Sequence, residues 1–165
     1  MKFLVTKKPV NRQDKYEYHP NNKYELQVII FNLIEKGISD LNCIDVSKID
    51  DMSWLFHSLN FSDTELKCLR QLDMSIWDVS NVTDMHAMFA GCKYLNTDIS
   101  MWDVSNVKNM SSMFEGCANF TSDLSNWKVS KDTKLKWIFY LCKNLKIPKW
   151  YNEFLSEKKV SKPSV

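Results

Sequence analysis

The chain has 165 residues and a formal net charge of +2, and its 44% hydrophobic and 25% charged residues suit one folded globular domain. Three Gly and four Pro are too few for a disordered or linker-rich protein, and there is no run of about 18 apolar residues that could span a membrane. The charge is uneven, because residues 38–127 carry 13 acidic and 5 basic side chains (−8) whereas residues 128–165 carry 3 acidic and 10 basic (+7).

Residues 22–37 have the pattern of an amphipathic helix. Asn22 can cap its first turn and Gly37 can end it. Its apolar residues recur at the spacing of one helix face: Leu26, Ile29, Ile30, Leu33 and Ile34. We therefore predict an N-terminal cap over residues 1–40, in which a short strand at residues 3–6 precedes this helix and the helix covers the first structural unit of the remaining chain.

A 25-residue repeat then organises most of the chain. The phrase Trp-Asp-Val-Ser-Asn-Val starts at Trp77 and again at Trp102, an eroded copy starts at Trp127, and a more degenerate copy starts at Ile44. Phenylalanine and cysteine recur in the same register, at Phe89, Phe114 and Phe139 and at Cys92, Cys117 and Cys142. Such a period predicts a stack of like units. We assign a repeat domain to 41–150 (44–76, 77–101, 102–126 and 127–149), with an insertion near residues 60–70, and a C-terminal cap with a frayed basic tail to 151–165.

Within one repeat the hydrophobic pattern changes its period. Alternating apolar positions in residues 95–104 predict an extended strand, whereas Met85, Met88, Phe89 and Cys92 stand at the helical offsets 0, 3, 4 and 7. Each repeat is therefore expected to be one coil of strand, turn and short helix. A lone coil cannot bury both faces, so the coils should stack and bury their Trp, Val, Met, Phe and Cys side chains in continuous rows.

The repeated words, with Met-Phe-x-Gly-Cys after Trp-Asp-Val-Ser-Asn-Val, resemble the 25-residue repeat of BspA-like leucine-rich-repeat proteins, which also occurs in mycoplasma lipoproteins. The resemblance covers about residues 44–150. It implies a leucine-rich-repeat-like solenoid that binds other macromolecules without catalysis. Members of the family are commonly surface adhesins. The fold class predicted is thus an α/β solenoid, a right-handed stack of about four strand–turn–short-helix coils with an N-terminal capping helix.

Little in the sequence indicates catalysis or a cofactor. The chain has five cysteines, an odd number that cannot all pair, and three of them share one repeat position. This favours reduced, buried thiols over disulfides. No Cys-x-x-Cys pair is present, and His19, His57 and His86 lack the spacing of a metal site or a catalytic triad. We expect no enzyme activity, no cofactor and no metal site.

Aspartates recur at three repeat positions, and two of these positions supply candidate binding residues. One set is Asp73, Asp98 and Asp123, and the other is Asp45, Asp78 and Asp103, with Asn81 and Asn106 close to the second set. In a stack these carboxylates form columns. Three interpretations remain open: side chains that cap local turns, a negative surface that binds a basic protein groove as nucleic-acid phosphates would, and a calcium site. We take these eight residues as the candidate partner-binding set.

The fourth repeat is rich in lysine. Lys128, Lys131, Lys134 and Lys136 replace residues that are mostly acidic or neutral in earlier copies. With Trp137 and Tyr140 nearby they could bind phosphates, although an ordinary solvated end of the stack explains them as well. Nucleic-acid binding is therefore the less favoured hypothesis.

These observations lead to one functional prediction and two alternatives. We predict a non-catalytic protein–protein interaction module, an inhibitor or adaptor in the cytoplasm with no membrane association, whose partner has a basic surface; a phage or mobile-element inhibitor of a nucleic-acid-handling host enzyme is one concrete version. The start of the chain has too short an apolar stretch for a signal peptide, which favours this location. The alternatives are a bacterial surface adhesin and a nucleic-acid-binding protein that uses the lysine-rich end.

Overall fold

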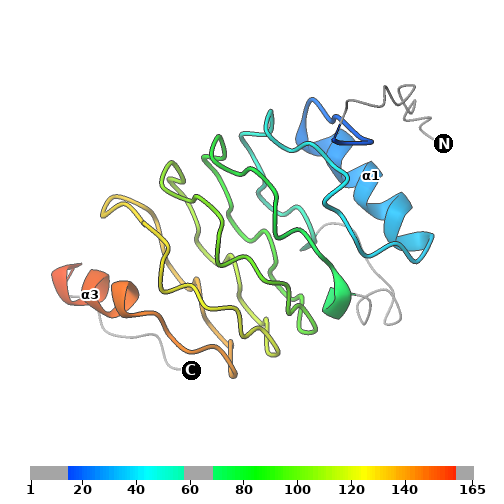
Figure 1. Ribbon diagram of the computed structural model, residues 1–165. Coiled ribbons are helices and arrows are strands. Elements are labelled where there is room, and N and C mark those ends of the chain that lie inside the picture. The colour runs from blue at the N-terminus through cyan, green and yellow to red at the C-terminus, as the bar shows by residue number, and fades with distance from the viewer. Residues whose placement is uncertain (1–14, 58–68, 159–165) are drawn as a thin grey trace.

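The computed structural model of the chain describes residues 15–57 and 69–158. Two α-helices, α1 (Lys23–Glu35) and α3 (Lys149–Lys158), stand at the two ends, and the repeats lie between them as successive loops side by side (Figure 1). A three-residue 3-10 helix, η2 (Leu69–Gln71), precedes the second repeat. The strand expected at residues 3–6 and most of the insertion expected near 60–70 lie outside the described residues.

Helix α1 begins and ends as the sequence predicted. The side chain of Asn22 accepts a hydrogen bond from the N–H of Glu25 at 3.0 Å. At the other end Gly37, with φ +73°, donates to the carbonyl of Ile34, and Ile38 donates to that of Leu33. These two bonds form a Schellman motif, in which a left-handed glycine satisfies the last helical carbonyls. The apolar face predicted for this helix is fully buried: Leu26, Ile29, Ile30, Leu33 and Ile34.

Polar contacts fix α1 against the first repeat. The Lys23 ammonium donates to the Asp51 carboxylate at 2.6 Å and to the Ser53 hydroxyl at 2.8 Å. One turn further along the helix, the Gln27 amide donates to the Leu55 carbonyl at 3.4 Å. Helix α1 therefore covers the end of the stack, where the first repeat has no preceding repeat to pack on.

The predicted α/β solenoid of strand–turn–short-helix coils is wrong. Among the described residues, the repeats contain no α-helix and no strand, and neighbouring repeats share only isolated parallel bridges. One row of these bridges joins Asp51 to Asp84, Asp84 to Asn109 and Asn109 to Lys134. Each repeat is instead a chain of tight turns, because its N–H groups bond either to a neighbouring repeat or within the turns themselves.

The segment predicted as a short helix, residues 85–92, sends its N–H groups to the next repeat. Alternate residues from Met85 to Gly91 donate to the carbonyls of alternate residues from Asn109 to Glu115, at 2.7–3.0 Å. Ala87 and Gly91 have φ values of +50° and +78°, which a right-handed helix excludes. The helical spacing of Met85, Met88, Phe89 and Cys92 therefore reflects the inward side of successive turns.

The segment predicted as a strand keeps its alternation without a ladder of hydrogen bonds. Residues 95–99 alternate between buried and exposed, as in a strand. Further along, however, the N–H of Trp102 closes a turn on the carbonyl of Ile99 at 3.2 Å, and that of Val107 closes one on Val104 at 3.0 Å. The residues that would form a strand use these donors in local turns, so no sheet results.

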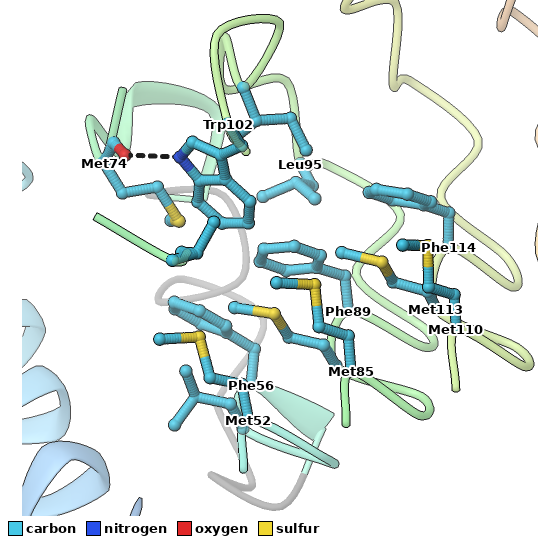
Figure 2. Packing of buried hydrophobic residues seen from close by; sticks show 14 of the residues in the cluster. Met52, Phe56, Met74, Met85, Phe89, Leu95, Trp102, Met110, Met113 and Phe114 are labelled. Atoms are coloured by element: carbon cyan, nitrogen blue, oxygen red, sulfur yellow. Dashed lines mark hydrogen bonds between the residues drawn. The ribbon is translucent and has the colours of Figure 1, made fainter. Parts of the chain in front are cut away.

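Side chains join the repeats where strands do not. The indole N–H of Trp102 donates to the carbonyl of Met74, 28 residues earlier in the chain, at 3.1 Å (Figure 2). Trp77 makes the equivalent bond to Leu41, and Trp127 makes it to Ile99. All three indoles are buried, so the prediction that they form part of the core is confirmed. The rings of Trp77 and Trp102 stack with 6.2 Å between centroids.

The core runs from end to end of the stack. Phe56, Phe89, Phe114 and Phe139 follow one another with centroids 5.1, 5.7 and 6.0 Å apart, and Met-Phe pairs of three successive repeats lie in a row (Figure 2). At the far end the ring of Tyr151 in α3 packs edge-on against that of Phe139, with 5.1 Å between the ring centroids. Helix α3, which the sequence patterns did not predict, covers the last repeat.

Candidate partner-binding surfaces

All six predicted aspartates close local turns. In each, Oδ1 accepts the backbone N–H of the serine two residues later, at 3.0–3.1 Å. The members are Asp45, Asp73, Asp78, Asp98, Asp103 and Asp123. This is an Asx turn, in which a short side chain takes the place of a backbone acceptor. The interpretation as turn-capping side chains therefore accounts for one oxygen of every carboxylate.

Hydrogen bonds in these turns favour the charged form of four of the carboxylates. The backbone N–H of Ser75 lowers the pKa of Asp73, and that of Ser100 lowers the pKa of Asp98. For Asp103 and Asp123 the hydroxyl of the serine two residues later is the largest cause of the lowered pKa, followed by the backbone N–H of that serine. A carboxylate that accepts hydrogen bonds is favoured in its charged form. These four carboxylates are therefore charged at neutral pH.

The turns present apolar side chains between carboxylates. Ile76 lies in the turn between Asp73 and Asp78 and is 52% exposed, and Met101 lies between Asp98 and Asp103 and is 83% exposed. The two turns belong to neighbouring repeats, and the charge of Asp73 acts against the lowering of the Asp98 pKa. We call these six residues, Asp73, Ile76, Asp78, Asp98, Met101 and Asp103, the acidic edge.

The two predicted asparagines hold neighbouring repeats together. The side-chain amide of Asn81 donates to the carbonyl of Ser47, and that of Asn106 donates to the carbonyl of Ser80, both at 2.8 Å. Ser80 is also the residue whose N–H and hydroxyl bind Asp78. These asparagines therefore fix one aspartate turn relative to the next.

The four predicted lysines are exposed but stand at different repeat positions. Lys128 occupies the position of Asp103, whose pKa its charge helps to lower, and Lys134 continues the row of parallel bridges from Asn109. Lys136 places its ammonium 4.2 Å from the centroid of the Trp137 ring. Lys131 lies between Lys128 and Lys134 in the sequence. The fold thus distributes these lysines around one repeat instead of collecting them in a single column.

Sequence reasoning missed a second surface, formed by left-handed turns. Trp54, Ala87, Ser112 and Trp137 share one repeat position, and all have φ between +50° and +60°. Four residues later Gly91, Gly116 and Leu141 also have positive φ. The sequence did carry a signal, because the first and fourth repeats have tryptophan where the second and third have Ala87 and Ser112. No pattern showed, however, that the two tryptophans are half exposed.

A depression of about 340 Å³ lies over these turns. Trp54 and His57 border it on the side of the first repeat, and Leu141 borders it on the side of the fourth. Its floor has small side chains or none: Ala87, Ala90, Gly91, Ser112 and Gly116. Glu115 also lines it. We call this surface the aromatic depression.

The cysteines of the repeat are structural. Cys92, Cys117 and Cys142 are free and buried, which confirms the prediction of reduced, buried thiols for these three. Cys117 donates its S–H to the carbonyl of Phe89 at 3.1 Å. Burial raises the pKa of Cys92 and of Cys142 to about 12. Thiols this basic stay protonated at neutral pH and are poor nucleophiles.

The histidines make separate structural contacts. His19 Nδ1 lies 3.2 Å from Asp45, His86 Nδ1 lies 2.8 Å from the carbonyl of Ser111, and His57 packs on Trp54. Within residues 15–57 and 69–158, no three His, Cys, Asp or Glu side chains are grouped to hold a metal ion. No helix in the same ranges is long and apolar enough to cross a bilayer.

Comparison with known proteins places the chain in one family. Neither a curated protein nor a solved structure matched it. The sequence pattern of the family described as "Mycoplasma protein of unknown function, DUF285" matches residues 28–150, which include most of α1 and the whole stack of repeats. The matched region is well over half of the chain, and the protein therefore belongs to this family.

Proposed function

We propose that this protein is a non-catalytic binding module whose acidic edge binds the basic surface of a partner protein. The observation that carries the proposal is the pair of exposed apolar side chains, Ile76 and Met101, each bracketed by two carboxylates. At protein interfaces a desolvated apolar centre supplies much of the affinity, whereas the charges around it steer and select the partner. A basic protein with an apolar patch has the complementary chemistry.

The rigidity of the acidic edge supports the same proposal. Asp78 and Asp103 are each held by hydrogen bonds to a serine two residues later, and Asn106 links their turns through the carbonyl of Ser80. Carboxylates already fixed in place lose little conformational entropy when a partner binds. This arrangement favours binding over a purely solvating role for the surface.

A narrower form of the proposal is an inhibitor or adaptor that acts inside the cell. Rows of carboxylates can occupy a basic groove in place of nucleic-acid phosphates, so a nucleic-acid-handling enzyme is the partner class that the charge pattern favours. The resemblance of the repeat to BspA-like proteins is a further argument for a binding role. The buried, protonated repeat thiols favour a protein without catalysis.

A pull-down with paired charge reversals tests the proposal. Tagged wild-type protein should recover a single basic protein from host lysate and release it as salt is raised. The double variant Asp78→Lys/Asp103→Lys should lose that protein, because each change places a like charge against the partner. Glu153→Lys/Glu157→Lys in α3 makes the same change in net charge elsewhere and should retain it. Equal recovery by both double variants would contradict a role for the acidic edge.

One observation favours nucleic acid as a second candidate ligand. Trp137 is 49% exposed and lies beside the Lys136 ammonium, so an indole and a cation are presented together, as in proteins that bind single strands. Binding of random single-stranded DNA or RNA by this pair should weaken steeply with salt and should be reduced by Trp137→Ala. Absence of binding at low salt would exclude nucleic acid as a ligand of this pair.

A further inference from the structure

Equivalent turns follow one another along one edge of the molecule, because the repeats lie side by side (Figure 1). Four tryptophans mark the equivalent positions, since each donates its indole N–H to a backbone carbonyl further back in the chain: Trp77, Trp102, Trp127 and Trp150. Residues of different turns can therefore be compared by their distance from these tryptophans.

The charge of this edge reverses between its two ends. Four residues before each tryptophan the chain has three aspartates and then a lysine: Asp73, Asp98, Asp123 and Lys146. One residue after the first three tryptophans it has two aspartates and then a lysine: Asp78, Asp103 and Lys128. Lys149 precedes Trp150 directly, as Met101 precedes Trp102. We call Lys128, Lys146 and Lys149, which are all exposed, the basic end of this edge.

The basic end lies next to the acidic edge. After the hydrogen bonds from the serine two residues later, the positive charge of Lys128 is a further cause of the lowered pKa of Asp103. Lys146 has the same effect on Asp123. Lys149 forms an ion pair within α3 at 3.6 Å, yet 90% of its side chain is exposed. One edge of the molecule thus has carboxylates in turns 73–78 and 98–103 and ammonium groups further along.

A second copy of the chain has the charge pattern that complements this edge. Two copies that lay edge to edge in the same direction would bring carboxylates against carboxylates, which repel. A twofold axis that runs across the stack between turns 98–103 and 123–128 reverses one copy instead. Each acidic edge then faces the basic end of the other copy. A twofold axis uses the same surface of both copies, so the assembly closes at two chains.

This arrangement brings matching turn positions of the two copies together. Opposite charges meet at two positions: Asp103 with Lys128, and Asp73 with Lys146. One pair has like charges, Asp98 with Asp123, and Lys146 lies beside it and offsets the repulsion. The exposed side chain of Ile76 meets the aliphatic stem of Lys149, and Met101, which is 83% exposed, meets Asn126 close to the axis.

We infer that this edge pairs two copies of the chain in antiparallel orientation, with the acidic edge of each copy against the basic end of the other. The apolar side chains of Ile76 and Met101, exposed in one chain, are covered in the pair. The interface has few apolar side chains, so we expect it to be weak and reversible. The inference goes beyond the proposed function and does not depend on it: a basic partner protein would compete with the second copy for the acidic edge.

Sedimentation equilibrium of the full chain measures the pairing. At low salt the mass should rise with protein concentration from 19.5 kDa toward twice that value. It should return to that of one chain as salt is raised to about 0.5 M, because the charges are then screened. A single chain at every concentration in low salt would overturn the inference. A mass that grows past two chains would overturn the twofold arrangement.

Two charge reversals test which residues meet. In Asp103→Lys two lysines meet at both contacts related by the twofold axis, and in Lys128→Asp two aspartates meet there. Each variant alone should pair at least about tenfold more weakly than the wild type. An equimolar mixture restores opposite charges at both contacts and should pair as the wild type does. A mixture that pairs no better than its separate components would contradict the assigned contacts.

The variants should fold, because the chain already has lysine and aspartate at this position in different turns, and an unchanged Tm would check this. Glu157→Lys and Lys158→Asp, at the end of α3, make the matching changes in net charge and should pair as the wild type does. Lys128→Asp also keeps every residue of the acidic edge. In the lysate pull-down it should therefore retain a basic partner while losing the second copy, so the two proposals can fail separately.

Discussion

The indole N–H of Trp150 donates to the carbonyl of Leu124 at 2.9 Å, and this is the same bond that Trp127 makes to Ile99 one repeat earlier. The spacing from Trp127 to Trp150 is 23 residues, not 25, and Trp150 lies in the first turn of α3. The row of tryptophans thus continues into the terminal helix. A helix that the repeat pattern did not predict is joined to the stack by the interaction that holds the repeats together.

The tryptophan row should be a main source of stability. Trp102→Phe removes a buried donor, leaves the carbonyl of Met74 without its indole partner and opens space in the core. We expect a loss of about 2–4 kcal/mol in the free energy of unfolding, measured by urea denaturation. Trp137→Phe, at a half-exposed position, is the control and should change stability by less than about 0.5 kcal/mol. Equal losses would mean that the buried row contributes no more to stability than an exposed indole does.

The left-handed turns should tolerate glycine better than alanine. Gly116 has φ +75°, and a Cβ added there would lie 3.6 Å from the Cα of Gly91, an ordinary contact. Gly116→Ala therefore tests backbone strain and not a clash, and it should reduce stability by about 1–2 kcal/mol. Calorimetric melting would show this as a lower Tm. An unchanged Tm would indicate that the turn relaxes out of the left-handed region.

Stability should fall at acidic pH because of the aspartate turns. In the folded chain the pKa lies below the ordinary value of 3.8 for four aspartates: Asp73, Asp98, Asp103 and Asp123. These groups therefore stabilise the fold when the pH is above the pKa of the unfolded chain. They lose that contribution as the pH falls below about 4. Urea midpoints at pH 7 and pH 3 would measure the loss.

Asparagine substitution separates charge from turn geometry. Asp98→Asn keeps an oxygen that can accept the N–H of Ser100 but cannot titrate in this range. The pH dependence of its urea midpoint should be flatter than that of the wild type. A variant with the same pH dependence as the wild type would show that acid destabilisation comes from other groups.

The repeat thiols should be inert until the protein unfolds. Burial keeps Cys92, Cys117 and Cys142 protonated and inaccessible. In a Cys43→Ser/Cys68→Ser variant, a thiol-specific chromogenic reagent at pH 8 should report almost no reaction in the native state and three thiols in guanidinium chloride. Rapid reaction of the native variant would indicate that the core opens readily.

The functional surfaces were predictable only in part. The sequence placed the aspartates in repeating positions, and they do recur in neighbouring turns, as Asp73 and Asp98 show. It did not show that Ile76 and Met101 are exposed between them, because a hydrophobic residue beside Trp77 or Trp102 is expected to be buried. The aromatic depression was not predicted at all, since it depends on backbone dihedral angles at Trp54 and Ala87 that composition and spacing do not encode.

The sequence by itself determined the period, the inward positions and the helix α1. Its 25-residue repeat specified that Phe89 and Phe114 would meet in the core, and Asn22 and Gly37 specified where α1 begins and ends. Only the tertiary structure decided the conformation of each repeat. The N–H of Met85 bonds to Asn109 in the next repeat, not to a residue four positions back, so the segment is a series of turns and not a helix. Spacing of apolar residues fixes which side chains face inward, whereas secondary structure depends on where each N–H finds its acceptor, and here many of those acceptors lie one repeat away.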